Sequence, residues 1–321
     1  RKMSKHLGNV LEPIPLMEEH GADAVRWYML ASGSPWSARR VGHDAISEVV
    51  RRTLLTYWNT VSFLSLYAAA SDFKLGAAPQ VSARPMMDRW ILSALNTLIS
   101  RVDAGYEGFD SQDVGEAISE FVDLLSNWYV RRSRRRFWDG DISALTTLHE
   151  CIETLTLLMA PMVPFITEHV WQVMLRQVKP NLPQSVHLAD FPRADAALIN
   201  PTLDAQVALT RRLVELGRAA RAQSQVKIRQ PLSRALIAAS GWSALNDELK
   251  AQIADELNVL NLDDISQTVG DLVDVTVKAN FRSLGAKYGA DVQAIAKAIA
   301  NTNPTELVTK LRSSDELTLE Y

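Results

Sequence analysis

The sequence predicts a mainly helical protein, in which a bundle of amphipathic helices is followed by a smaller α+β domain. Up to Pro231, apolar residues recur at spacings of three and four, and prolines and short polar stretches separate these runs. After Pro231 the pattern changes, and short alternating apolar runs mix with helical ones. With 321 residues, 47% of them hydrophobic, the chain can bury one large or two medium cores.

The predicted helices follow one another with short connections, as in a helical bundle. Residues 1–22 are expected to form a loop, because Gly8, Pro13 and Pro15 interrupt any regular pattern. Asp110 offers an N-cap for one of the helices that follow. Helical spacing predicts helices over 24–28, 46–61, 87–102, 111–128, 142–159, 165–178 and 201–220.

The last third of the chain predicts strands near 234–238 and 273–277 and helices over 245–257 and 292–299. Asn303, Pro304 and Glu306 are typical of a further helix start. We therefore expect four parts: a loop over 1–22, a helical domain over 23–195, a basic helical connector over 196–233 and an α+β domain over 234–321. The chain starts without Met and stops in an alternating pattern, so we expect a fragment.

Composition excludes several classes of protein. No run of about 18 apolar residues occurs, so no membrane span is expected, and no apolar stretch follows the basic start as in a signal peptide. The single cysteine, Cys151, forms neither an internal disulfide nor a Cys-rich zinc site, which favours a cytoplasmic protein. The six histidines are scattered without ligand spacing, so we expect no metal site.

The net charge of -3 hides an uneven distribution. Residues 211–229 hold six basic residues against one acid, whereas residues 245–321 hold thirteen acids against seven bases. An anionic partner is therefore expected to meet the first two-thirds of the chain.

The first candidate site is Lys2-Met3-Ser4-Lys5. Two lysines three residues apart on a mobile loop suit the binding of polyphosphate, whose negative charge moves during a reaction. Any exposed loop can carry two lysines, so these four residues alone do not decide the matter. Residues 2–10 and 21–28 together, however, resemble the KMSKS loop of class I aminoacyl-tRNA synthetases and the segment after it. The resemblance implies that Lys2, Ser4 and Lys5 bind ATP, with Mg²⁺, during adenylate formation; His6 stands where the family commonly has Ser.

The second candidate site is an arginine string over 127–138. Five arginines on one helix, at 100° per residue, would spread over a little more than half of its circumference. Some must therefore pair with nearby acids, such as Asp123, Asp139 and Asp141, or lie on tryptophan rings. Others can bind RNA phosphates, and aromatic rings can stack on unpaired bases. The candidates are Arg131, Arg132, Arg134, Arg135, Arg136, Trp128 and Trp138, and the sequence leaves both interpretations open for each arginine.

This string resembles the anticodon-binding helix of isoleucyl-tRNA synthetases, whereas valyl and leucyl relatives share the Trp-Tyr pair without the arginine run. Residues 160–171 resemble a proline-broken helix start of this class I subgroup, for which we expect a packing role, and residues 185–192 resemble a family string that closes the bundle. Residues 221–232 resemble a basic family segment, which implies that Lys227 and Arg229 lie along the tRNA. Residues 277–285 resemble the eukaryote-like branch, whose bacterial members include actinobacteria.

The resemblance implies an anticodon-binding helical bundle in a ligase that joins isoleucine to tRNA(Ile) in translation. The catalytic domain, with its amino-acid pocket and editing insertion, would precede Arg1, so we expect this chain alone to be inactive. ATP and isoleucine would be substrates of the whole enzyme, and we expect a cytoplasmic monomer. Two alternatives stay open: the equivalent part of a valyl or leucyl relative, and a helical interaction module with structural arginines.

Overall fold

The computed structural model describes residues 4, 6, 10–34, 36–71, 73–265 and 279–302. The chain forms two compact units, residues 1–209 and residues 210–321. The four-part division expected from the sequence stays a prediction. In the described part of the chain, no helix is both long and apolar enough to cross a membrane.

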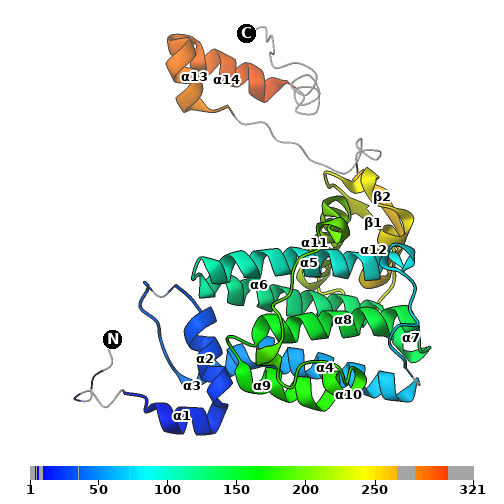
Figure 1. The fold of residues 1–321 in the computed structure, drawn as a ribbon. Coiled ribbons are helices and arrows are strands. Elements are labelled where there is room, and N and C mark those ends of the chain that lie inside the picture. Colours follow the sequence, from blue (N-terminus) through cyan, green and yellow to red (C-terminus); the bar gives the residue numbers. More distant parts are fainter. Residues whose placement is uncertain are drawn as a thin grey trace. The chain divides into compact units, whose positions relative to one another are not determined.

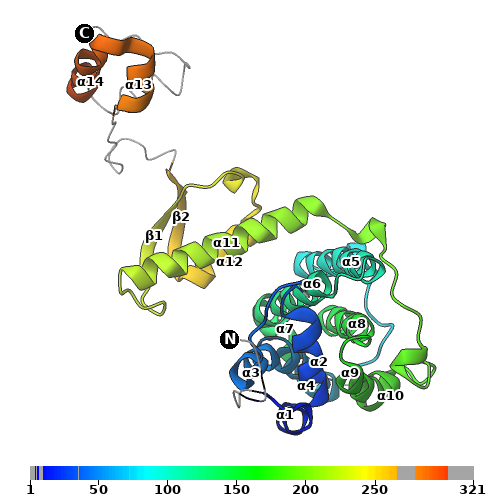
Figure 2. The ribbon, with the colours of Figure 1, turned by 90° about the vertical axis from the view of Figure 1, so that its left-hand side faces the viewer.

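Every secondary-structure element among the described residues of the first unit is a helix. Figure 1 shows α4, α5, α6 and α8 as long helices running side by side, and Figure 2 looks along them. The core between them is apolar, with Tyr57, Ile91, Ile118 and Leu148 at most 1% exposed. The helices are α1 (Pro13–His20), α2 (Ala22–Ala31), α3 (His43–Val49), α4 (Leu55–Ala70), α5 (Met86–Glu107), α6 (Ser111–Asp123), α7 (Arg134–Trp138), α8 (Ile142–Met159), α9 (Pro164–Val170), α10 (Arg176–Val178) and the start of α11 (Pro201–Gln223).

The prediction of a loop over residues 1–22 was wrong from Pro13 onward, where α1 begins. Proline breaks a helix interior, but in the first turn its missing N–H has no intrahelical partner to lose and its φ is already helical. Pro13 is the first residue of α1, and Pro15 also lies in that turn. The helix ends at Gly21, whose φ of 89° lets the chain turn into α2.

Three of the predicted helices contain a π-helical segment. These segments are Val50–Leu54, Leu124–Val130 and Trp171–Leu175. A π-helical turn holds an extra residue and rotates the side chains that follow it. The prediction of helices over 46–61, 111–128 and 165–178 is confirmed, but their periodicity is interrupted in each case.

Asp23 connects two segments that are far apart in sequence. Its Oδ2 accepts hydrogen bonds from the backbone N–H groups of Phe165, at 3.0 Å, and Ile166, at 2.7 Å, at the start of α9. Arg26 pairs with the same carboxylate and lies 4.7 Å from the centre of the Phe165 ring. The exposed amides of a helix N-terminus favour such an acceptor. Besides the packing role expected for residues 160–171, the start of α9 is capped by Asp23 of α2.

The second unit contains a two-stranded parallel sheet of β1 (Leu232–Ile237) and β2 (Val259–Asp264), connected through α12 (Asp247–Leu257). The end of α11 packs closely on α12, since a Cβ on Gly217 would lie 2.5 Å from the Leu257 side chain. Two more helices follow, α13 (Phe281–Tyr288) and α14 (Val292–Asn301). The mainly helical fold with a small α+β part is confirmed. The strand predicted near 273–277 and the helix start at 303–306 lie outside the described residues.

Candidate nucleic-acid interface

The arginine string does not lie on one continuous helix. Arg131 and Arg132 follow the π-helical segment Leu124–Val130, Ser133 forms a turn, and α7 begins at Arg134. The expected spread of five arginines around a single regular helix was therefore wrong. The turn and the preceding π-helical segment point the individual arginines into different surroundings.

Arg136 is held by two carboxylates. Its Nη1 and Nη2 donate to the two oxygens of Asp88, at 2.6 and 2.8 Å, and its Nε donates to Asp141 at 2.8 Å. Asp88 lies in the first turn of α5 and is 0% exposed. Burial alone lowers the pKa of Arg136, but the hydrogen bonds to Asp88 and Asp141 outweigh it and raise the pKa above its usual value. Arg136 is thus a charged residue committed to the fold.

The same network joins four elements at one end of the bundle. The hydroxyl of buried Tyr129 donates to Asp88 at 2.8 Å. The other oxygen of Asp141 accepts from the N–H groups of Ser143, at 2.8 Å, and Ala144, at 3.2 Å, and so caps α8. Burial tends to raise the pKa of Asp141, but Arg136 and these amides hold it below the usual value. The π-helical segment, α5, α7 and α8 are thereby fixed to one another.

Arg134 and Arg135 differ from Arg136 in being exposed. Among the residues that the structure describes, neither side chain forms a hydrogen bond or an ion pair. Trp138 is 63% exposed, and its indole N–H donates to the hydroxyl of Tyr67 at 2.5 Å. The anchored residue Arg136 is therefore flanked on the short helix α7 by two available guanidinium groups and an accessible ring.

Arg131, Arg132 and Trp128 are more engaged. Trp128 is 5% exposed, and the guanidinium of Arg131 lies 5.7 Å from the centre of its ring. The Nε of Arg131 also donates to the carbonyl of Asn127 at 2.9 Å, while Arg132 is half-buried. Trp128 is placed to support Arg131 from beneath, and the roles predicted for these three residues stay predictions.

Asp88 is the residue that the sequence reasoning missed. The acids considered there were close in sequence, and of these Asp141 does pair with Arg136, whereas Asp88 is 48 residues away from it. A signal was nevertheless present, since Asp88 stands among Met86, Met87, Trp90 and Ile91 on an apolar helix face. A carboxylate on a core face needs a charged or hydrogen-bonding partner.

The second basic segment, in the second unit, has an arginine anchor of a different kind. Arg221 is 6% exposed, and its Nη2 donates to the carbonyls of Lys227, at 2.7 Å, and Gln230. The loop that it holds turns at Gln225, whose φ is 55°. Lys227 and Arg229 are exposed on this loop, as a role in binding phosphate requires.

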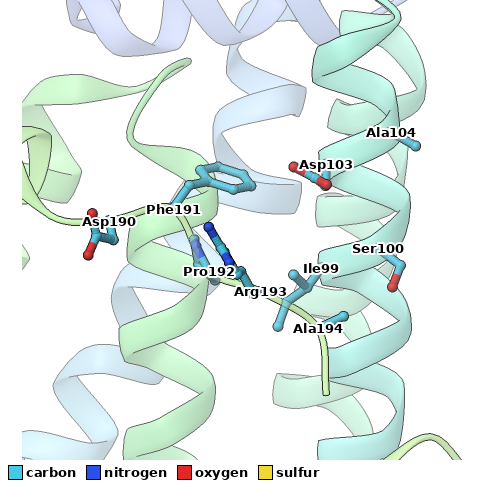
Figure 3. A pocket seen from close by; sticks show the side chains of 9 residues that line it. All are labelled: Ile99, Ser100, Asp103, Ala104, Asp190, Phe191, Pro192, Arg193 and Ala194. Carbon is cyan, nitrogen blue, oxygen red and sulfur yellow. The ribbon is translucent and has the colours of Figure 1, made fainter. Parts of the chain in front are cut away.

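Lys2 and Lys5 lie outside the described residues, and of the first candidate site only Ser4 is described, as a half-buried residue. A cavity of about 910 Å³ lies elsewhere in the first unit, between α5 and residues 190–194. Figure 3 shows Phe191 and Arg193 on one wall and Asp103 of α5 across from them. None of the predicted site residues lines this cavity.

Comparison with known families agrees with this geometry. Residues 88–236 match the family model described as the anticodon-binding domain of tRNA ligase, and residues 1–40 match that of class I tRNA synthetases for I, L, M and V. These two matches identify the chain as part of a class I tRNA synthetase.

The individual relatives identify a narrower family than these models do. The chain is 59% identical over 313 residues to the isoleucine–tRNA ligase of Streptomyces avermitilis, and 56% identical over 329 residues to that of Thermobifida fusca. These matches cover 97% and 100% of the chain but only 30% and 31% of the relatives. The chain belongs to the isoleucine–tRNA ligase family and spans about 30% of the length of these relatives. A solved ternary complex of Agrobacterium radiobacter K84 LeuRS is 24% identical, with a TM-score of 0.46 over 62% of this chain and 23% of that chain.

Proposed function

We propose that the chain supplies the tRNA-binding part of an enzyme that joins isoleucine to tRNA(Ile). The observation that carries the proposal is the contrast on α7, where anchored Arg136 adjoins exposed Arg134, Arg135 and Trp138. An arginine pair whose backbone is fixed loses less freedom on binding than one on a loose loop. Arg134 and Arg135 bind phosphates of the anticodon stem and loop, and Trp138 stacks on an unpaired base.

The other basic residues have supporting roles. Arg136 is a positioning residue that holds α7, and Trp128 supports Arg131, which with Arg132 extends the charged surface. Lys227 and Arg229 bind the tRNA backbone from the second unit. Phosphate contacts of this kind supply affinity without reading sequence.

Lys2, Ser4 and Lys5 stabilise the phosphates of ATP, with Mg²⁺, when isoleucine attacks the α-phosphorus. We infer that the amino-acid pocket for that reaction lies in the part of the enzyme that this chain, spanning about 30% of the length of its relatives, does not include. We therefore expect no isoleucine-dependent exchange of ATP and pyrophosphate from this chain alone. We also expect a monomer that works in the cytoplasm.

The test compares the Arg134→Ala/Arg135→Ala variant with a matched control, Arg51→Ala/Arg52→Ala. Both variants remove two adjacent exposed arginines from the first unit. Binding is measured at several salt concentrations to isoleucine tRNA, the same tRNA with a changed anticodon, and valine tRNA. The first variant should bind isoleucine tRNA at least about tenfold more weakly, with a salt slope smaller by about 1.4 for two lost single-strand phosphate contacts.

The control should bind isoleucine tRNA as the unmodified chain does. Equal losses in the two variants would mean that general positive charge, rather than α7, attracts the tRNA. Equal binding of all three tRNAs by the unmodified chain would contradict the assignment of anticodon recognition to this surface.

A further inference from the structure

A cluster of one carboxylate and two imidazoles lies at the junction of α1 and α3. Glu19 and His20 end α1, and His43 begins α3. His20 Nε2 lies 3.0 Å from His43 Nδ1, which is also 3.1 Å from Glu19 Oε2, and His20 Nε2 lies 3.5 Å from Glu19 Oε1. In the described part of the chain, this is the group of three such side chains whose ligand atoms converge within 4.8 Å.

With both imidazoles neutral, at most one N–H serves the two shortest contacts of this cluster. The two shortest edges, of 3.0 and 3.1 Å, meet at the same atom, Nδ1 of His43. A ring nitrogen has one in-plane position, occupied by either an N–H or a lone pair. If that nitrogen donates to Glu19 it cannot accept from His20, and if it accepts from His20 its lone pair faces a carboxylate oxygen. A single proton on that nitrogen is therefore either shared between the two close contacts or leaves one of them without a proton.

A single divalent cation satisfies all three atoms at once. Tetrahedral zinc binds nitrogen at about 2.0–2.1 Å and carboxylate oxygen at about 2.0–2.2 Å, which separates neighbouring ligand atoms by about 3.3 Å. The separations of 3.0 Å between the two ring nitrogens and 3.1 Å between His43 Nδ1 and Glu19 Oε2 lie just below that value, and the other carboxylate oxygen, Oε1, lies 3.5 Å from His20 Nε2. Two imidazoles and a carboxylate are also the donors that suit zinc and neighbouring first-row metals.

We propose that Glu19, His20 and His43 bind one divalent first-row transition-metal ion, with zinc as the expected ion and water as its fourth ligand. The His20 side chain is 9% exposed, whereas those of His43 and Glu19 are 47% and 59% exposed. The buried imidazole forms the floor of the site, and the two accessible ligands leave room for entry of the ion and for the water.

The bound ion connects α1 and α3, which are separated in sequence by α2 and the segment after it. His20 and His43 are 23 residues apart, so the ion closes a loop that contains α2 and the segment after it. Ligands from both sides hold the end of α1 against the start of α3. In the described part of the chain α1 is the first α-helix after the segment that holds Lys2, Ser4 and Lys5, so the ion ties the helix next to the proposed ATP-binding segment to the bundle.

The spacing of these ligands explains why the sequence did not suggest them. Short motifs place metal ligands a few residues apart, whereas this set needs two helix ends to meet in the folded chain. The prediction of no metal site rested on the single cysteine and on the sequence spacing of the histidines, and the structure brings together two of the six histidines.

The test uses the chain without a histidine tag, stripped of metal by a chelator and then dialysed. Zinc binding is measured by calorimetry, and cobalt binding by its visible absorption, for the unmodified chain and three variants. His43→Ala and Glu19→Gln alter exposed ligands and should leave the fold intact, and His187→Ala removes an exposed histidine of the same unit as a control. The unmodified chain and the control should bind one zinc ion per chain.

His43→Ala should bind zinc more than about tenfold more weakly, since even an outer-shell partner of a metal ligand is worth that much. Glu19→Gln should also weaken binding. Zinc should raise the unfolding temperature of the unmodified chain and of His187→Ala but not that of His43→Ala. Zinc bound with equal affinity by His43→Ala, or no zinc bound by the unmodified chain at 100-fold molar excess, would overturn the proposal.

Discussion

The two basic segments each contain an arginine that is anchored to the fold, half-buried in the first and buried in the second. In residues 131–138 the anchor, Arg136, faces the carboxylates of Asp88 and Asp141. In residues 221–230 the anchor, Arg221, faces backbone carbonyls, and its Nε and Nη1 have no hydrogen-bond partner within the described residues. Arg136 connects helices through ion pairs, and Arg221 holds a loop through hydrogen bonds to its backbone.

The difference decides what each anchor contributes. A buried carboxylate that loses its cation stays buried and uncompensated, which is among the most destabilising changes a fold can suffer. The carbonyls around Arg221 lie on a loop whose neighbouring residues are exposed, so water can replace the lost donor. We expect the first anchor to govern the stability of its unit and the second to govern the order of one loop.

The largest expected effect follows from Arg136→Ala. The variant leaves Asp88 without its cation at 0% exposure, so the free energy of unfolding should fall by about 3–5 kcal/mol. Urea unfolding followed by tryptophan fluorescence measures the change. Arg135→Ala is the matched control. Arg135 is the exposed neighbour of Arg136, and its side chain forms no ion pair in the described structure, so the variant should change the free energy of unfolding by at most about 0.5 kcal/mol.

A double variant separates the loss of the cation from the loss of packing. Arg136→Met combined with Asp88→Leu removes both charges while keeping apolar volume, so it should be more stable than Arg136→Ala. If the double variant is as unstable as the single one, the buried charge is not the cause. Loss of Arg136 and loss of Arg221 would then differ only in how strongly they destabilise the fold.

A smaller and more local effect is expected for Arg221→Ala. Hydrogen bonds from a charged donor are worth about 1.5–3 kcal/mol, and here they hold one loop. Trypsin should cleave after Lys227 and Arg229 at least about tenfold faster, because the loop opens more often. Arg212→Ala, which removes an exposed arginine paired with Glu215, should leave this cleavage unchanged. Unchanged cleavage in Arg221→Ala would show that the loop is ordered by other contacts.

A feature could be predicted from the sequence where the residues that determine it are close together along the chain, and not where they meet only in the folded structure. The helix over 142–159 was predicted with its observed bounds, because its apolar spacing and the prolines that follow it are local signals. The start of α1 at Pro13 is also determined locally. Predicting it requires knowing that the proline occupies the first turn of a helix, where it is tolerated, and the presence of a proline alone does not show this. The partner of Arg136 was not accessible, since Asp88 meets it only after α5 and α7 have packed.

The basic segments themselves were recognised, but their internal division was not. Five arginines looked alike in sequence, and burial against Asp88 singles out Arg136 from its exposed neighbours. The same holds for Arg221 beside Lys227 and Arg229. Which arginine turns inward depends on a helix break at Ser133 and a positive φ at Gln225, and neither follows from periodicity.

The smallest effect, and the sharpest test of the contrast, comes from Lys227→Ala/Arg229→Ala. If the loop binds only phosphates, the variant should bind isoleucine tRNA and its anticodon-changed form more weakly by the same factor, about three- to tenfold. Lys287→Ala/Lys297→Ala removes the same charge from exposed positions in the acidic last third of the chain and should have no such effect. A loss that depends on the anticodon would mean that this loop also takes part in recognition. The division into an anticodon-binding helix and a phosphate-binding loop would then fail, although both anchors would keep their structural roles.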